Sequence, residues 1–191
     1  MFCLTSTTGY YDTAPNDLEL EQYIASMACK NTDALRTIYR ETSSAVYGFA
    51  LSILKNEHDA QDVLQETYIK MYAACSNYQP QGKPMAWILT IAKNLARMKL
   101  RERNKTTYES FEDQEQFFYE PPNLSLEDKM VLNAALKELS SQECQIVLLH
   151  AVSGLKYREI ADILDLALPT VLSKYHRALK KLKNKLSEGY K

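Results

Sequence analysis

Apolar residues recur every three or four positions through almost the whole 191-residue chain, and this spacing constrains the fold more than any other feature. The pattern is clearest over about five turns: Ala60, Val63, Leu64, Thr67, Tyr68, Met71, Tyr72 and Cys75. Such spacing puts these side chains on one face of an α-helix that buries them. The same spacing predicts seven more helices. One begins near residue 17, one ends near residue 55, one begins at Pro84 and one at Ser125, and the last three cover residues 145–152, 156–164 and 169–187.

Other features of the sequence agree with an all-α fold. The chain has only 5 glycines and 6 prolines, and no two glycines are close together. This excludes the glycine-rich phosphate loop and argues against a many-stranded fold. The 4 cysteines and 3 histidines lack the spacings of a zinc site, so we expect no metal, no cofactor and free thiols.

The sequence also bears on location. No apolar run approaches the ~18 residues of a membrane-spanning helix. Residues 1–16 lack both a basic start and an apolar stretch, so they do not resemble a secretory signal. We therefore expect a cytoplasmic protein without membrane insertion.

The helical pattern stops once, between two helical domains. Residues 17–105 form the first expected domain and residues 125–191 the second, whose first helix opens with a capping box at Ser125 and Asp128. Residues 106–124 contain the pair Pro121-Pro122 and show no period, so they are interpreted as an extended linker.

The net charge of −1 hides a strong segregation of charge. Residues 93–105 carry +5, residues 106–128 carry −7 and residues 170–191 carry +6. A neutral total usually argues against nucleic-acid binding, but two basic blocks separated by an acidic one leave that function open.

The second domain contains a helix-turn-helix pattern. Tyr157–Leu164, a short turn and the helix from Pro169 have the required spacing, with the small residue Ala161 where two helices must cross. The second helix presents candidate contacts to base edges and phosphates: Thr170, Ser173, Lys174, His176, Arg177, Lys180, Lys181, Lys183 and Lys185. The alternative is a helical hairpin with a solvated basic tail.

The other basic block lies beside aromatic and amide side chains. Lys93, Asn94 and Arg97 follow Trp87, with Tyr78 upstream. Aromatic rings next to lysine and arginine suit unpaired bases, which stack and are read on their exposed edges. For Trp87 the alternative of a packed core residue is favoured.

Taken in order, these motifs resemble bacterial sigma factors of the extracytoplasmic-function class. Tyr47–Ala50 with Asp59–Glu66 is similar to the family's core-polymerase-binding stretch. Trp87–Ala96 is similar to its promoter-melting helix, and Tyr157–Ala161 with Thr170–Ala178 to its minus-thirty-five-binding helix-turn-helix. The resemblance extends over nearly all of residues 20–187.

The resemblance implies a non-enzymatic subunit that directs RNA polymerase core to promoter DNA and helps to open it. It implies that the clamp helices of the polymerase large subunit contact Asp59, Asp62, Gln65 and Glu66. It also implies a second contact, with the flap of the polymerase. It assigns the minus-ten DNA to Asn77, Tyr78, Lys83, Lys93, Asn94, Arg97 and Arg101. It assigns the minus-thirty-five DNA to Thr170, Leu172, Ser173, Lys174, His176, Arg177, Lys180 and Lys181. An anti-sigma partner and a phosphate-mimicking role for the acidic linker are further implications.

The chain departs from the family pattern at three positions. Lys174 stands where arginine is usual, and lysine cannot make the bidentate fork to guanine. Leu172 replaces a basic or polar residue and could contact a thymine methyl. Asp165 occupies the turn where glycine is common, a milder change because aspartate tolerates the left-handed conformation.

Two other functions account for fewer of these features. A stand-alone helix-turn-helix regulator leaves Asp62, Gln65, Glu66 and the basic-aromatic helix without a role. A helical hydrolase using Glu66 or His58 lacks a paired nucleophile or metal ligands.

Overall fold

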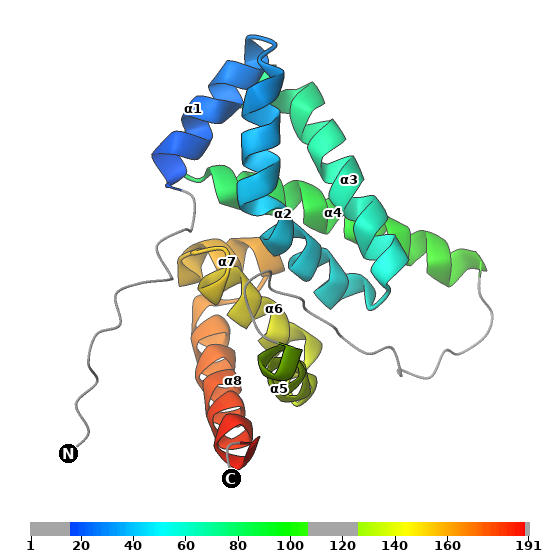
Figure 1. Cartoon of the computed structure of the whole chain (residues 1–191), viewed down its shortest axis with the longest axis vertical. Helices are drawn as coiled ribbons and strands as arrows, with labels where there is room; N and C mark the ends of the chain where they lie inside the picture. The colour runs from blue at the N-terminus through cyan, green and yellow to red at the C-terminus, as the bar shows by residue number, and fades with distance from the viewer. Residues whose placement is uncertain (1–15, 107–125, 190–191) are drawn as a thin grey trace.

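Every regular element in the described residues, 16–106 and 126–189, is helical in the computed structural model (Figure 1). The α-helices are α1 (Asp17–Ala28), α2 (Thr32–Leu54), α3 (Glu57–Ala74), α4 (Pro84–Thr106), α5 (Leu126–Lys137), α6 (Ser141–Ala151), α7 (Tyr157–Leu164) and α8 (Leu168–Gly189), with a short 3₁₀ turn, η1 (Cys75–Asn77), after α3. The predicted all-α class and its helices are confirmed. None of the described helices has the length and apolar character needed to span a bilayer.

Side-chain caps explain where several helices begin. The carboxamide oxygens of Asn16, Asn31 and Asn56 accept hydrogen bonds from the first backbone N–H groups of α1, α2 and α3. Ser140 and Glu143 form a reciprocal capping box at the start of α6, as the sequence predicts. Ser125 and all but the first residue of the predicted linker lie outside the described residues; that first residue, Thr106, ends α4.

Helices α1 to α4 form one bundle. Its interior is built on fully buried side chains such as Phe49, Ile38 and Ile88. One polar pair crosses it: the hydroxyl groups of Thr42 and Tyr68 lie 2.7 Å apart, and the Thr42 hydroxyl also donates to the carbonyl of Ile38. Burial raises the pKa of Tyr68, so its phenol stays protonated.

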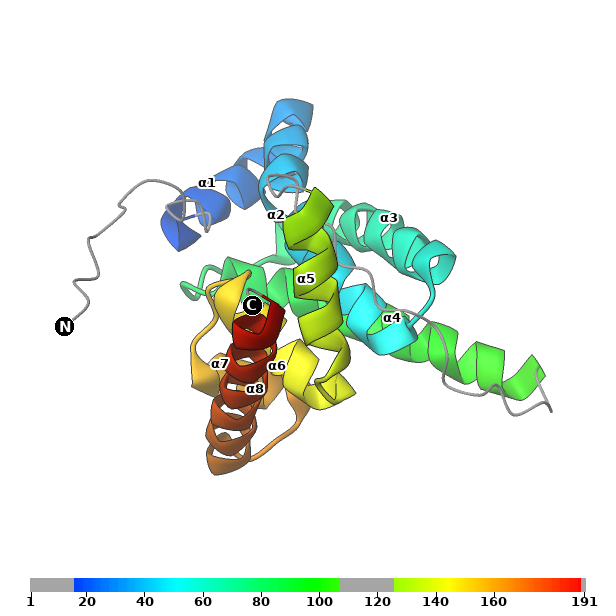
Figure 2. The same ribbon diagram turned by 60° about the horizontal axis from the view of Figure 1, so that its bottom comes forward.

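Helices α5 to α8 form a second bundle that packs directly on the first, with α6 against α2 and α7 against α4 (Figures 1 and 2). One cluster of buried side chains joins the two bundles, including Leu51 and Leu95 with Leu148. The carbonyl of Ser52 near the end of α2 accepts hydrogen bonds from Ser141 and Gln145 of α6. The sequence predicts two bundles but does not predict that they share a core.

A buried carboxylate connects the helices of the second bundle. Glu143 is only 2% exposed, and its carboxylate accepts from the backbone of Ser140 and, at 2.8 Å, from the ammonium of Lys181 on α8. Burial by itself would raise the pKa of Glu143, but the bonds from Lys181 and Ser140 hold it below its usual value. Lys181 therefore has a structural partner inside the protein.

Replacing this lysine should destabilise the fold. Lys181→Met leaves a buried carboxylate without its cation, so we expect the free energy of unfolding to fall by about 1–3 kcal/mol. Urea denaturation followed by circular dichroism measures this. Lys185→Met is the matched control, because Lys185 pairs with the exposed Glu138 at 3.7 Å and should cost under about 1 kcal/mol.

The effect should also depend on pH. The pKa of Glu143 is lower in the folded than in the unfolded state, so the stabilisation is present above the unfolded value and is lost as pH falls through the folded value. A deficit in Lys181→Met that persists unchanged in strong acid would contradict this assignment.

Candidate functional site

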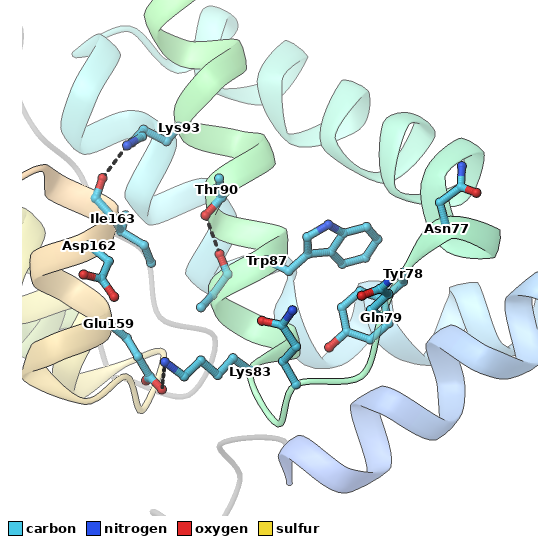
Figure 3. Close-up of a pocket in the computed structure, with 12 residues that line it drawn as sticks. Asn77, Tyr78, Gln79, Lys83, Trp87, Thr90, Lys93, Glu159, Asp162 and Ile163 are labelled. Carbon is cyan, nitrogen blue, oxygen red and sulfur yellow. Dashed lines mark hydrogen bonds and ion pairs between the residues drawn. The ribbon is translucent and has the colours of Figure 1, made fainter.

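A cavity of about 480 Å³ lies between the segment before α4 and the helix α7 (Figure 3). Its first wall belongs to the loop–α4 surface, which we define as the loop 77–83 together with Trp87, Thr90, Lys93 and Arg97 of α4. Arg97 extends this surface beyond the cavity and does not line it. Its second wall consists of Glu159, Asp162 and Ile163 of α7. The cavity therefore joins aromatic and cationic groups of one bundle to carboxylates of the other.

The loop is held by a residue that sequence reasoning missed. Glu21 of α1 accepts two hydrogen bonds on one carboxylate oxygen, at 3.1 Å from the Tyr78 hydroxyl and at 2.7 Å from the backbone N–H of Gly82. Gly82 has a φ of +68°, a conformation that side chains rarely adopt. Glu21 lies more than fifty residues upstream in the sequence, so no local motif could connect it to this loop.

Trp87 only partly fits the interpretation as a core residue. Its ring packs against Tyr78, with centroids 4.7 Å apart and planes inclined by 46°, yet it also lines the cavity. Burial is the main cause that raises the pKa of Tyr78, and the hydrogen bond to Glu21 raises it further. The Tyr78 hydroxyl therefore stays protonated and remains a donor. The pair forms a braced aromatic wall that is open on the cavity side (Figure 3).

Two of the predicted DNA-binding cations contact the second bundle; Lys93 is buried there, whereas Arg97 stays about half exposed to solvent. Lys93 is 8% exposed, and its ammonium donates to the carbonyl of Ile163 at 2.6 Å and to the carboxylate of Asp165 at 3.2 Å. Arg97 donates to the same Asp165 oxygen at 3.0 Å. The hydrogen bonds from Arg97 and Lys93 hold the pKa of Asp165 below its usual range.

The other predicted minus-ten residues are more open. Lys83 lies 3.8 Å from the carboxylate of Glu159, with its own side chain half exposed. Asn77 is exposed on the loop, and Asn94 and Arg101 are exposed on α4. The structure therefore brings Asn77, Tyr78, Lys83 and Lys93 to one cavity, whereas Asn94, Arg97 and Arg101 do not line it.

The α3 polar face, defined as Asp59, Asp62, Gln65 and Glu66, divides into two parts. Gln65 and Glu66 are exposed, and Glu66 pairs along its own helix with Lys70 at 3.3 Å. Asp59 is turned towards α4, where Lys99 contacts it at 3.3 Å and also bonds to Asp62. The bond to Asp62 raises the pKa of Lys99, so this cation stays charged.

The second helix of the helix-turn-helix is anchored on one side and open on the other. Val171 and Ala178 are fully buried, whereas Ser173, His176, Arg177 and Lys180 are exposed. The predicted contacts Thr170, Leu172 and Lys174 are partly exposed, and Lys181 differs because it bonds Glu143. Asp165 adopts the left-handed conformation expected for the turn, with φ 55°, and Ala161 is buried as predicted.

These surfaces suit binding to polyanions and bases. Arginine and lysine match phosphates, and the aromatic wall can stack a planar base. In the described residues no group of three or more histidine, cysteine, aspartate or glutamate side chains could hold a metal ion. Cys75 and Cys144 are buried free thiols, and burial raises the pKa of Cys144 to about 11.

Comparison with known proteins identifies both bundles. Residues 38–106 match the family model Sigma-70 region 2, and residues 129–182 match Sigma-70, region 4. The ECF RNA polymerase sigma factor SigE of Mycolicibacterium smegmatis is 33% identical over 157 residues, which are 79% of this chain but only 61% of that protein. EcfG of Rhodopseudomonas palustris is 29% identical over 155 residues, 79% of this chain and 84% of that protein.

Solved structures agree on the fold. CnrH, in its complex with the cytosolic domain of CnrY, matches 89% of this chain and 98% of its own with a TM-score of 0.59 and 21% identity. The sigma factor RpoE, in complex with the anti-sigma factor NepR from Bartonella quintana, matches 80% and 96% with a TM-score of 0.60 and 24% identity. With two family models together matching more than half of its residues, the chain belongs to the sigma-70 family, in the extracytoplasmic-function class.

Proposed function

We propose that this protein is a dissociable specificity subunit of RNA polymerase, which binds the core enzyme, recognises promoter DNA and helps to open it without catalysis of its own. The observation that carries the proposal is the loop–α4 surface, where a braced tyrosine–tryptophan pair and cations line one cavity. Such a surface fits an unpaired base and its phosphates, which a regulator of duplex DNA does not need.

Three surfaces divide this work. The α3 polar face binds the clamp helices of the polymerase large subunit, and Gln65 and Glu66 are exposed for that contact. The loop–α4 surface, with Asn94 and Arg101, holds the minus-ten strand. The exposed side of α8, which includes Arg177, binds the minus-thirty-five duplex. The second bundle also contacts the flap of the polymerase. In domain terms the first two belong to residues 17–105 and the third to residues 125–191.

An anti-sigma factor is proposed as a further partner. Two structures of similar fold are complexes, one with the cytosolic domain of CnrY and one with the anti-sigma factor NepR. An inhibitor of this chain would be expected to cover the same polymerase- and DNA-facing surfaces.

In vitro transcription with purified core polymerase and a library of promoters tests the proposal. We expect specific initiation only when core and this protein are combined, and poor promoter binding by the protein alone. If the free protein footprints one duplex site as tightly as the mixture does, the stand-alone regulator is the correct function.

Removing the polar contacts on α3 should weaken association with core. Asp62→Ala combined with Gln65→Ala is expected to reduce affinity by about tenfold, since truncating an interface contact often costs more than 1 kcal/mol. Both residues are exposed, so the helical content should stay unchanged. Asp33→Ala, on an exposed pair with Arg36, is the control, and equal affinities in all three proteins would refute the assignment.

Replacing Arg177 should weaken minus-thirty-five binding selectively. Arg177→Ala is expected to cost about 1–3 kcal/mol in holoenzyme binding to promoters that carry this element. Association with core should not change, because Arg177 lies on the exposed side of α8. Arg36→Ala removes one exposed positive charge elsewhere and controls for net charge.

Releasing the loop should relax discrimination at the minus-ten element. Glu21→Ala removes the acceptor of both loop hydrogen bonds. We expect preference between minus-ten bases, measured by competition of single-stranded oligonucleotides for holoenzyme, to fall about fivefold, equivalent to ~1 kcal/mol. Glu21→Gln keeps an acceptor oxygen and should restore the preference; if it fails to do so, these two hydrogen bonds do not set the minus-ten preference.

A further inference from the structure

The helix α8 presents a leucine beside its packed side, near the beginning of the helix. The α8 side chains that pack in the protein interior include Val171, Tyr175, Ala178 and Leu182, which are spaced by three or four residues. Leu172 follows Val171, and each residue turns an α-helix by about 100°. Its side chain is partly exposed and therefore borders the open side of α8, at the edge of the second bundle in Figure 1.

A proline extends this uncharged surface. Pro169 is exposed and lies three positions before Leu172, so the two side chains are neighbours on one side of the helix. Neither side chain can donate or accept a hydrogen bond. We define Pro169 and Leu172 as the α8 apolar patch.

The patch lies where a helix-turn-helix contacts bases. In such motifs the N-terminal residues of the second helix contact base edges in the major groove. Residues 168–174 contain no arginine, asparagine or glutamine, the side chains that make paired hydrogen bonds to guanine or adenine. Bases at this end of α8 are therefore left to the hydroxyl groups of Thr170 and Ser173, to Lys174 and to apolar contact.

The major groove offers one apolar feature that distinguishes a base. Thymine carries a methyl group at C5, whereas the other groups that identify base pairs in this groove donate or accept hydrogen bonds. Leu172 placed against a G·C pair would remove water from those groups without replacing their hydrogen bonds, which is unfavourable. Placed against the thymine methyl, it would bury hydrocarbon on both sides of the contact.

We propose that the α8 apolar patch reads the methyl group of a thymine in the minus-thirty-five element, with Leu172 as the residue that determines specificity at that base pair. This inference rests on the proposed function and names the base feature that the same helix recognises. The exposed cations Arg177 and Lys180 further along α8 contact phosphates and supply affinity that does not depend on sequence. Added salt should therefore weaken binding as a whole and leave the preference for the methyl group unchanged.

Removing the methyl group alone tests the proposal. Holoenzyme first selects its minus-thirty-five element from duplexes that are randomised there. Each thymine of the selected element is then replaced, one at a time, by deoxyuridine, which still pairs with adenine and lacks only the methyl group. We expect one replacement to weaken binding about fourfold, which corresponds to the ~0.8 kcal/mol of one buried hydrocarbon group. If no replacement weakens binding, the proposal is overturned.

Three variants assign the effect to one side chain. Leu172→Ala should bind the thymine and deoxyuridine duplexes equally, whereas Leu172→Met keeps an apolar chain and should retain the preference. Leu179→Ala is the matched control, because Leu179 is 42% exposed and lies two turns further along the same side of α8. Circular dichroism checks that each variant is folded. If Leu172→Ala keeps the fourfold preference, or Leu179→Ala loses it, Leu172 does not read the methyl group.

Transcription with core polymerase separates this failure from failure of the proposed function. If core and this protein initiate from the selected promoters but no duplex shows the methyl preference, the readout is wrong and the proposed function stands. If no promoter supports initiation, the function is wrong, and the selection and replacement scan are repeated with the free protein, since a stand-alone regulator would use the same helix. Equal binding of all duplexes in that scan would overturn the readout as well.

Discussion

The arrangement of the two bundles depends on an ammonium group that is almost excluded from water. Lys93 projects from α4 and donates hydrogen bonds to the Ile163 carbonyl and the Asp165 carboxylate. Both of these acceptors lie on the other bundle. A buried cation without acceptors would be strongly unfavourable, so α7 and α4 must meet in this register or separate and let water in. The apolar cluster that includes Leu51, Leu95 and Leu148 keeps them together, and the polar contacts decide how they are aligned.

The structure shows which acidic groups pair with the basic helix, and the charge distribution along the sequence does not predict them. The sequence places +5 on residues 93–105 and −7 on residues 106–128, which suggests the linker as the acidic counterpart of the basic helix. In the described residues, which leave out nearly all of the linker, Asp165 of the turn and Asp59 and Asp62 of α3 are acidic groups that contact the basic helix. Some of the opposite charges that cancel in the net charge of −1 therefore also pair with each other in the structure, although their surfaces are assigned to different ligands.

The same residues explain why some functional assignments were accessible from the sequence and others were not. Periodicity and capping residues are local, so the eight α-helices, the Ser140–Glu143 box and the buried position of Ala161 could be predicted. Lys181 shows what local sequence patterns cannot predict. In the sequence it belongs to a basic run that suits phosphate binding, whereas its bond to the buried Glu143 depends on how α8 crosses α6.

By itself, the sequence determined the all-helical class, the order of three motifs, and the polar and basic residue types on their helix faces; that one of these faces meets polymerase is what the family resemblance implies. These properties follow from spacing along the chain, which sets the face of a helix on which each side chain lies. Tertiary structure alone decided that Glu21 holds the loop of Tyr78 and Gly82, and that Asp165 meets Lys93 and Arg97. Those contacts join residues about sixty to seventy positions apart, and only the packing of one bundle on another, or of α1 on the loop before α4, brings such residues within hydrogen-bonding distance.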